Sequence, residues 1–171
     1  TSCRDLPVKY WGFKDHGLEP AAMKQLVDVM KANGKTTFLE VVSYTEEECM
    51  RGARLGVECG FDYLLGTLYF DSVYEYVKKT DLKYCPFVGK VSQTPSILEG
   101  TVEEMLAQEA AFADKGIYGT DLLGYRYTGE NVDEFCADFV KGAKHPVCLA
   151  GSIGSEERIE KVKKMNPWPF T

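Results

Sequence analysis

The chain has 171 residues, of which 44% are hydrophobic and 27% charged, and its formal net charge is -6 with a pI near 5.0. These are the proportions of a globular protein with one sizeable core, so we expect a single domain over residues 1–171. The acidic balance argues against a nucleic-acid partner, and no apolar run approaches the roughly 20 residues that cross a membrane.

The six cysteines form no C-x-x-C pair and mostly fall in apolar or helical segments, which predicts reduced thiols. Together with the lack of a recognisable secretion signal, this predicts a cytoplasmic protein. We expect a small-molecule partner, no membrane partner, and leave homo-oligomerisation open. The cysteines are Cys3, Cys49, Cys59, Cys85, Cys136 and Cys148.

Strand-like and helix-like segments alternate along the whole chain. The predicted strands are residues 8–13, 36–43, 62–69, 82–89, 120–127, 146–153 and 168–171. The predicted helices are residues 21–34, 45–60, 70–80, 101–116, 131–143 and 155–165. The strands are nearly continuous apolar runs, which is typical of a parallel sheet covered by helices.

Local signals mark the ends of two of these helices. Thr45 precedes Glu48 by three residues and Thr101 precedes Glu104 by three, which is capping-box spacing. Gly60 and Gly116 follow the last periodic residues as C-terminal stops.

Two architectures fit the alternation: a (β/α)8 barrel and an open doubly wound sheet. Spacing of roughly 25 residues between most strands, without a G-x-G-x-x-G motif after the first strand, favours the barrel. A full barrel usually needs about 200 residues or more. We therefore expect the first strand with its helix, and the end of the eighth strand, to be missing or abbreviated.

Polar residues after the strands are the candidates for chemistry, because the loops after the strands form the working face of such barrels. The first strand ends in Lys14, Asp15 and His16. Glu40 lies between apolar neighbours on the next strand, where a carboxylate facing the helices would be buried at high cost, so it should point into the barrel mouth. A Lys14–Glu40 pair could move a proton and stabilise an enolate, or could be a buried ion pair that closes the lumen.

Two alternatives concern neighbouring residues. Asp15 takes the role of Glu40 if the strand parity is shifted by one residue, and Lys14 then turns outward. His16 is treated as a bystander, and His145 precedes its strand and belongs to the stability face.

Further along the chain, four residues are candidates for substrate binding. Lys90 opens the longest connection, residues 90–100, which also carries Ser92 and could form a lid or a surface loop. Arg126 at the end of its predicted strand could clamp an anion. Asp121 lies deeper on that strand, in the lumen or capping the bottom layer.

The segment LAGSIGSEERI, residues 149–159, is the clearest local signal. A strand runs into the small residues Gly151, Ser152, Ile153 and Gly154, and a helix then begins with Ser155 as its expected N-cap. Small residues allow close backbone approach, and N–H groups near a helix start favour a phosphate. The alternative is a tight connection with glycine chosen for its backbone freedom.

The runs PVCLAGSIGSEERI and NPWPFT resemble the seventh and eighth strands of the ribulose-phosphate-binding barrels. In that superfamily backbone amides after strand seven hold phosphate, which implies Gly151, Ser152 and Ile153 here; the other half of the site would follow Thr171. The runs GFKD, FLEVVS, PFVGK, DLLGYRY and AGSI are similar to a group of uncharacterised bacterial barrel proteins.

Known barrel mechanisms narrow the chemistry further. The D-x-K-x-x-D array of the orotidine-monophosphate decarboxylase relatives is missing from FLEVVS, and Arg126 stands where class I aldolases carry their Schiff-base lysine. No His, Cys and Asp cluster has metal-site spacing. We therefore expect metal-free and cofactor-free isomerase, epimerase or lyase chemistry on a small phosphorylated carbonyl compound. The alternative is a non-catalytic phosphometabolite sensor.

Overall fold

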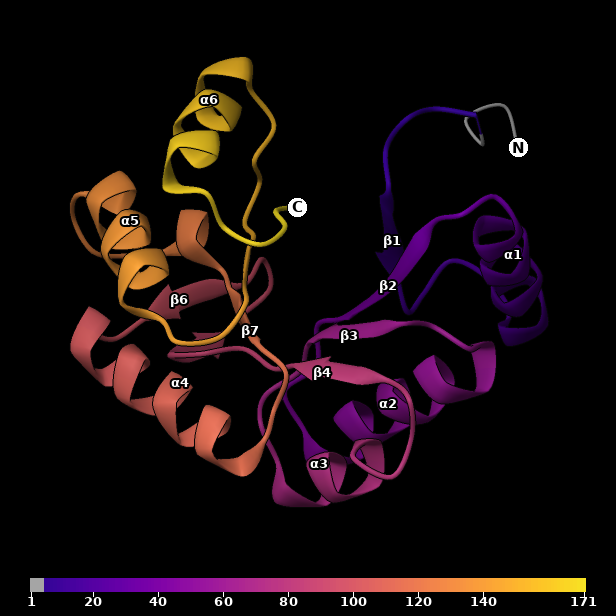
Figure 1. The fold of residues 1–171 in the computed structure, drawn as a ribbon. Coiled ribbons are helices and arrows are strands. Elements are labelled where there is room, and N and C mark those ends of the chain that lie inside the picture. Colours follow the sequence, from indigo (N-terminus) through magenta and orange to yellow (C-terminus); the bar gives the residue numbers. More distant parts are fainter. Residues whose placement is uncertain (1–4) are drawn as a thin grey trace. The chain divides into compact units, whose positions relative to one another are not determined.

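The computed structural model describes residues 5–171, so Cys3 lies outside the described part of the chain. The chain divides into two compact units, Thr1–Tyr84 (unit 1) and Cys85–Thr171 (unit 2). Strands and helices alternate in both units, which makes the fold mixed α/β as the sequence predicts (Figure 1). The single domain expected from length stays a prediction.

Unit 1 is a four-stranded sheet in the order β1-β2-β3-β4, with helices between successive strands. β1 pairs with β2 and β2 pairs with β3, both in parallel. The connecting helices lie along one side of this sheet (Figure 1). The elements are β1 (Tyr10–Lys14), α1 (Pro20–Ala32), β2 (Thr36–Val41), α2 (Glu46–Cys59), β3 (Tyr63–Gly66), α3 (Asp71–Val77) and β4 (Lys83–Cys85).

Gly52 of α2 allows this helix to approach β2 closely. A Cβ atom at Gly52 would lie 2.5 Å from Cγ1 of Val41, whereas a Cβ atom at Gly56 would be in ordinary contact with Cδ2 of Leu39, at 3.5 Å, and closer to Cδ2 of Leu82, at 3.0 Å. Leu39 and Val41 are fully buried. Because side chains alternate along a strand, Leu39 and Val41 define the face of the sheet that α2 covers, and Phe38 lies on the other face.

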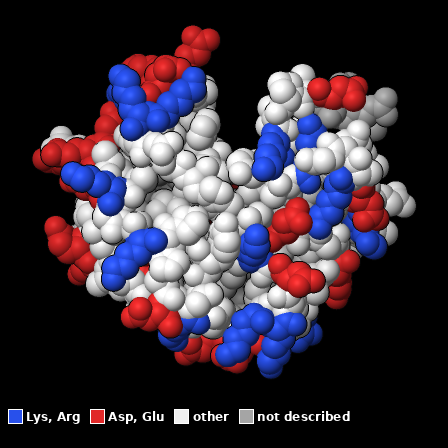
Figure 2. Space-filling view, viewed as in Figure 1, with Lys and Arg blue, Asp and Glu red and all other residues white. Residues whose placement is uncertain are grey.

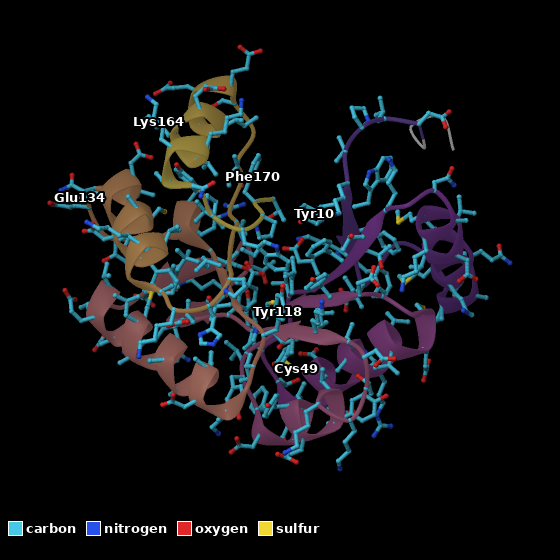
Figure 3. All side chains as sticks on the ribbon, viewed as in Figure 1. Tyr10, Cys49, Tyr118, Glu134, Lys164 and Phe170 are labelled. Carbon is cyan, nitrogen blue, oxygen red and sulfur yellow. The ribbon has the colours of Figure 1, made fainter. Side chains whose placement is uncertain are left out.

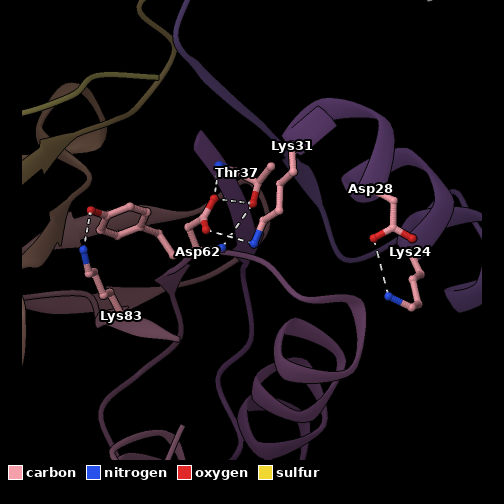
Figure 4. Close-up of polar contacts among 7 residues, drawn as sticks. Lys24, Asp28, Lys31, Thr37, Asp62 and Lys83 are labelled. Carbon is pink, nitrogen blue, oxygen red and sulfur yellow. Dashed lines mark hydrogen bonds and ion pairs between the residues drawn. The ribbon is translucent and has the colours of Figure 1, made fainter. Parts of the chain in front are cut away.

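A polar cluster lies where the strands of this sheet begin, at their N-terminal ends (Figure 4). A side-chain oxygen of Asp62 accepts hydrogen bonds from the backbone N–H and the hydroxyl of Thr37 at 2.7 and 2.8 Å. The other oxygen lies 2.9 Å from Nζ of Lys31 on α1. One carboxylate thus links α1, β2 and the start of β3.

Unit 2 contains an antiparallel hairpin and a parallel strand pair. β5 pairs with β6, and β7 pairs with β8. Isolated parallel bridges join Phe87 to Asp121 and Leu149 to Phe170. The elements are β5 (Lys90–Ser92), β6 (Ile97–Glu99), α4 (Val102–Lys115), β7 (Thr120–Leu122), the 3-10 helix η1 (Gly124–Arg126), α5 (Val132–Gly142), β8 (Val147–Leu149) and α6 (Glu156–Met165).

The predicted helix ends are confirmed where capping chemistry marks them. The hydroxyl of Thr45 accepts from the backbone N–H of Glu48, and Thr101 forms a complete capping box with Glu104. Gly60 and Gly116 end α2 and α4 in the left-handed conformation, at φ of 76° and 86°. The hydroxyl of Ser155 accepts from the N–H of Arg158, so Ser155 is the N-cap of α6.

Three predicted segments differ from the structure. The strand predicted over residues 120–127 ends at Leu122, and Arg126 lies in η1 instead of at a strand end. The connection over residues 90–100 is not a loop, because Lys90 begins β5 and Ser92 ends it. The strand expected at residues 168–171 is reduced to a single bridge at Phe170.

The strand pairs of the described chain form three sheets, of four, two and two strands. These sheets contain the parallel pairing that the sequence predicts. Within residues 5–171 the paired strands do not form the closed ring of a barrel. The five described cysteines are buried thiols without a disulfide; the labelled Cys49 lies inside unit 1, while Glu134 and Lys164 extend outward (Figure 3). None of the helices in residues 5–171 combines the length and apolar character needed to cross a bilayer.

Candidate functional site

Lys14 and Glu40 lie side by side where β1 and β2 end. Their Cα atoms are register partners in the parallel pair, and the backbone N–H of Asp15 donates to the carbonyl oxygen of Glu40 at 3.2 Å. Neighbouring strands are about 4.8 Å apart, so the two side chains start close together at one edge of the sheet. Lys14 is exposed and Glu40 half-buried.

The register also fixes the face on which these side chains stand. Gly12 is the register partner of Phe38. Lys14, two residues after Gly12, is the register partner of Glu40. Phe38 stacks on Tyr63 with ring centroids 4.6 Å apart and meets the edge of Tyr10 at 5.5 Å. Since alternate residues share a face, Lys14 and Glu40 stand above this aromatic row, on the face that α2 does not cover.

Between the described residues no ion pair joins Lys14 to Glu40. A carboxylate and an ammonium at one sheet edge, not bonded to each other, have the chemistry needed to remove a proton and to stabilise the negative charge that results.

Asp15 lies on the other strand face and lines a different space. It borders a groove of about 840 Å³ together with His16 and residues of α2 that include Arg51. The groove has an apolar part, with Leu18 and Met50, and a charged rim. Lys14, and not Asp15, therefore shares a face with Glu40.

In unit 2 the turn after β8 has an unusual backbone. Gly151 has φ of 115° and Ser152 has φ of 67°, a left-handed conformation that a residue with a side chain rarely adopts. A Cβ atom at Gly151 would lie 3.1 Å from the backbone nitrogens of Tyr125 and Arg126, so any side chain at this position would be both crowded and strained. Within residues 5–171 the N–H groups of Gly151, Ser152 and Ile153 donate to no protein acceptor.

Behind this turn, α5 and α6 enclose a groove of about 460 Å³. Nη1 of Arg158 donates to the carbonyl oxygen of Ser152 at 2.7 Å, and its guanidinium lies 4.5 Å from the ring centroid of Tyr125. The hydroxyl of Tyr125 donates to Asp133 at 3.0 Å, and Asp133 pairs with Lys161 at 2.8 Å. α6 carries both signs of charge over its surface (Figure 2).

These contacts shift two ionisation equilibria. Burial and the hydrogen bond to Asp133 raise the pKa of Tyr125 to about 12. The hydrogen bond from Lys161 lowers the pKa of Asp133 against its partial burial. Tyr125 is therefore neutral and Asp133 ionised at neutral pH, which keeps the chain of contacts intact.

The remaining predicted substrate-binding residues are spread over unit 2. Lys90 is exposed at the start of β5 and Ser92 is half-buried at its end. Asp121 is 1% exposed, with Cys148 as its register partner. Arg126 is half-buried, and its backbone N–H donates to the carbonyl of Leu123.

His145 lies two residues before the start of β8. Its backbone N–H and its ring Nδ1 lie 2.9 and 3.2 Å from a carboxylate oxygen of Glu109, which is 1% exposed on α4. The position before the strand and the buried partner fit a role in stability.

Sequence reasoning missed Arg158, Tyr125, Asp133 and Lys161. Arg158 follows the N-cap Ser155 by three residues, which places it over the first turn of α6 and next to the turn that precedes it. Within residues 5–171 no group of three or more His, Cys, Asp and Glu side chains could hold a metal ion.

No protein-family model and no curated protein matches the chain. Among solved structures, the chain is similar to the glycerol uptake operon antiterminator regulatory protein from Listeria monocytogenes, with a TM-score of 0.66, 16% identity, and coverage of 99% of this chain and 83% of that one. For the N-acetylmannosamine-6-phosphate 2-epimerase from Clostridium perfringens the TM-score is 0.58, the identity 10%, and the coverage 94% and 83%.

FabK from Thermotoga maritima matches with a TM-score of 0.58, 9% identity, and coverage of 90% of this chain and 46% of that one, so the chain spans about half of FabK. The antiterminator protein and the epimerase have TIM-barrel-like folds. At these identities the likeness concerns the fold: the chain is a mixed α/β protein with barrel-like neighbours.

Proposed function

We propose that the chain is a phosphate-binding (β/α)8 barrel of the ribulose-phosphate-binding type. In this proposal the turn Gly151–Ile153 binds phosphate, and Lys14 and Glu40 are the residues for proton transfer in a reaction of a small phosphorylated carbonyl compound. The activity is that of an isomerase, an epimerase or a carbon–carbon lyase. It invokes neither a metal ion nor a cofactor.

One observation carries the phosphate part of the proposal. Three consecutive backbone N–H groups, those of Gly151, Ser152 and Ile153, have no acceptor among the described residues. Backbone N–H groups left without a partner gain most from a charged acceptor such as phosphate, and the start of α6 adds partial positive charge. The similarity to an epimerase of an amino-sugar phosphate supports the same ligand class.

The proton-transfer part rests on the register of β1 and β2. The Glu40 carboxylate would take a proton from the carbon next to a carbonyl group, leaving an enolate whose oxygen accepts a hydrogen bond from the Lys14 ammonium. Return of the proton to the other face of that carbon gives the epimer. Its return to the former carbonyl carbon, with the proton of the adjacent hydroxyl group moving to the former carbonyl oxygen, gives the isomer. A positioned acid or base of this kind contributes about 10²- to 10⁴-fold in rate.

Proton exchange tests this assignment before the substrate is known. A panel of phosphorylated aldoses and ketoses is incubated with the protein in D₂O, and loss of the C–H signal next to the carbonyl is followed by NMR. We expect exchange with the wild type, a loss of at least about 100-fold in Glu40→Gln, and unchanged phosphate binding in that variant. Glu130→Gln, an exposed carboxylate in unit 2, is the matched control and should behave as wild type.

A second candidate is a non-catalytic phosphometabolite sensor, which the similarity to a regulatory antiterminator protein favours. Phosphate binding at Gly151–Ile153 without proton exchange on any sugar phosphate of the panel would support the sensor. If saturating phosphate leaves the amide resonances of Gly151, Ser152 and Ile153 unchanged, both candidates fail.

A further inference from the structure

Arg158 is held in one place by contacts on several sides. Its backbone N–H donates to the hydroxyl of Ser155 at 3.2 Å, and Nη1 donates to the carbonyl oxygen of Ser152 at 2.7 Å. The guanidinium lies over the ring of Tyr125 at 4.5 Å, a cation–π distance. Tyr125 in turn is held through its hydroxyl by Asp133 at 3.0 Å.

The contact of Arg158 with Ser152 fixes the orientation of the whole peptide plane between Ser152 and Ile153. In a trans peptide the C=O of one residue and the N–H of the next point in opposite directions across a rigid plane. The carbonyl oxygen of Ser152 points toward Arg158 of α6. The N–H of Ile153, which belongs to the same peptide plane, must therefore point away from Arg158.

The turn needs such a restraint because its backbone is not in a preferred conformation. Ser152 has φ of 67°, in the left-handed region that residues other than glycine populate sparsely. A second hydrogen bond reaches the same carbonyl oxygen from the N–H of Gly154 at 3.0 Å. Arg158 supplies the charged one of the two donors, and charge-assisted hydrogen bonds are the stronger kind.

We propose that Arg158 is a positioning residue for the phosphate-binding turn: by holding the Ser152 carbonyl it aims the Ile153 N–H at the anion. This inference rests on the proposed phosphate function and adds to it the residue that sets the direction of the amides. Arg158 acts through the peptide plane and does not itself touch the phosphate.

The test compares Arg158→Met with Lys163→Met. Both substitutions remove one positive charge from α6, but only Arg158 bonds to the turn, since the ion pair of Lys163 is with Glu160. Inorganic phosphate is titrated into each ¹⁵N-labelled protein at constant ionic strength, and the amide resonances of residues 151–153 are followed. Circular dichroism confirms that each variant is folded.

We expect phosphate to bind about tenfold more weakly to Arg158→Met, which corresponds to one charged hydrogen bond. The Ile153 resonance should move in the phosphate-free Arg158→Met variant and lose its response to phosphate, whereas Lys163→Met should keep wild-type shifts. If both variants bind phosphate equally weakly and show the same Ile153 response, the effect is a general loss of positive charge, and this result overturns the inference.

The outcomes separate the two proposals. Wild-type protein without any response to phosphate refutes the proposed function, whereas wild-type and Arg158→Met proteins that respond equally refute the role of Arg158 alone. If Arg158→Met does not fold, Arg158→Lys replaces it, because lysine keeps the charge but has no planar group to stack on Tyr125 while it donates. A wild-type Ile153 shift and response in Arg158→Lys then overturns the inference.

Discussion

Asp62→Ala is expected to destabilise unit 1 by about 3 kcal/mol, although Asp62 is only half-buried. The carboxylate is the acceptor for two donors of Thr37, at 2.7 and 2.8 Å, and Thr37 is 0% exposed. With alanine at position 62, the buried N–H and the buried hydroxyl of Thr37 would lose their charged acceptor.

The magnitude follows from these contacts. Each buried donor left without an acceptor costs about 1–3 kcal/mol, and water entering the partly open site reduces the sum. The ion pair with Lys31 adds at most about 1 kcal/mol, because its side chains are 40% and 34% exposed. Asp62→Asn keeps one acceptor oxygen and loses the charge, so it should cost about 1 kcal/mol.

Urea unfolding measures the effect, and the two tryptophans allow unit 1 to be followed by itself. Trp11 is in unit 1 and Trp168 in unit 2, so in a Trp168→Phe background the fluorescence change reports unit 1. Asp28→Asn is the matched control, because within residues 5–171 the one ion pair of Asp28 is with Lys24, at 3.5 Å with both side chains more than half exposed (Figure 4). It should change the free energy of unfolding by no more than about 0.5 kcal/mol.

The pH dependence provides an independent readout. Burial raises the pKa of Asp62, but the hydrogen bonds from Thr37 and Lys31 outweigh it and the pKa is lowered overall. A lowered pKa in the folded state means that this contribution is fully present above the unfolded pKa of about 4 and is lost as pH falls through the lower folded pKa. Asp62→Ala should therefore flatten the acid limb of the stability curve. Equal effects of Asp62→Ala and Asp28→Asn at neutral pH would refute the reasoning.

Two further predictions concern packing and reactivity in the cores. Gly52→Ala should destabilise unit 1 by about 1–3 kcal/mol in the same urea assay, because the added methyl group would lie 2.5 Å from Val41, whereas Gly154→Ala, with open space around it, should change stability little. Burial raises the pKa of Cys49 to about 11 and that of Cys136 to about 12, so both thiols should react with Ellman's reagent at pH 8 only after unfolding; prompt reaction of folded protein would contradict the buried environment.

The sequence was sufficient where one local rule decides the structure. Thr45 and Thr101 mark helix starts because a hydroxyl in that position satisfies a backbone N–H three residues on. The neighbourhood of Lys14 and Glu40 follows from apolar strands separated by a helix, since consecutive parallel strands usually pair and end at the same edge.

Other features depend on contacts between distant residues. Residues 90–100 form a hairpin in which Leu98 pairs with Val91 and bridges to Tyr127, a contact that no short pattern reveals. Arg126 could not be placed because the apolar run of its strand continues into η1 without a break in composition. The sequence does not indicate Arg158, because the residues that hold it, Ser152 and Tyr125, come from two different connections.

The two glycines of α2 have a consequence for the order in which unit 1 assembles. Each glycine inside a helix costs roughly 1 kcal/mol relative to alanine, so α2 has little tendency to form while the chain is unfolded. The same glycines let Val41 of β2 and Leu82, next to β4, approach the helix backbone, and this packing exists only once the sheet is in place. The helicity of α2 therefore depends on the sheet. The amide hydrogens of α2 and β2 should exchange with solvent together, as one cooperative unit.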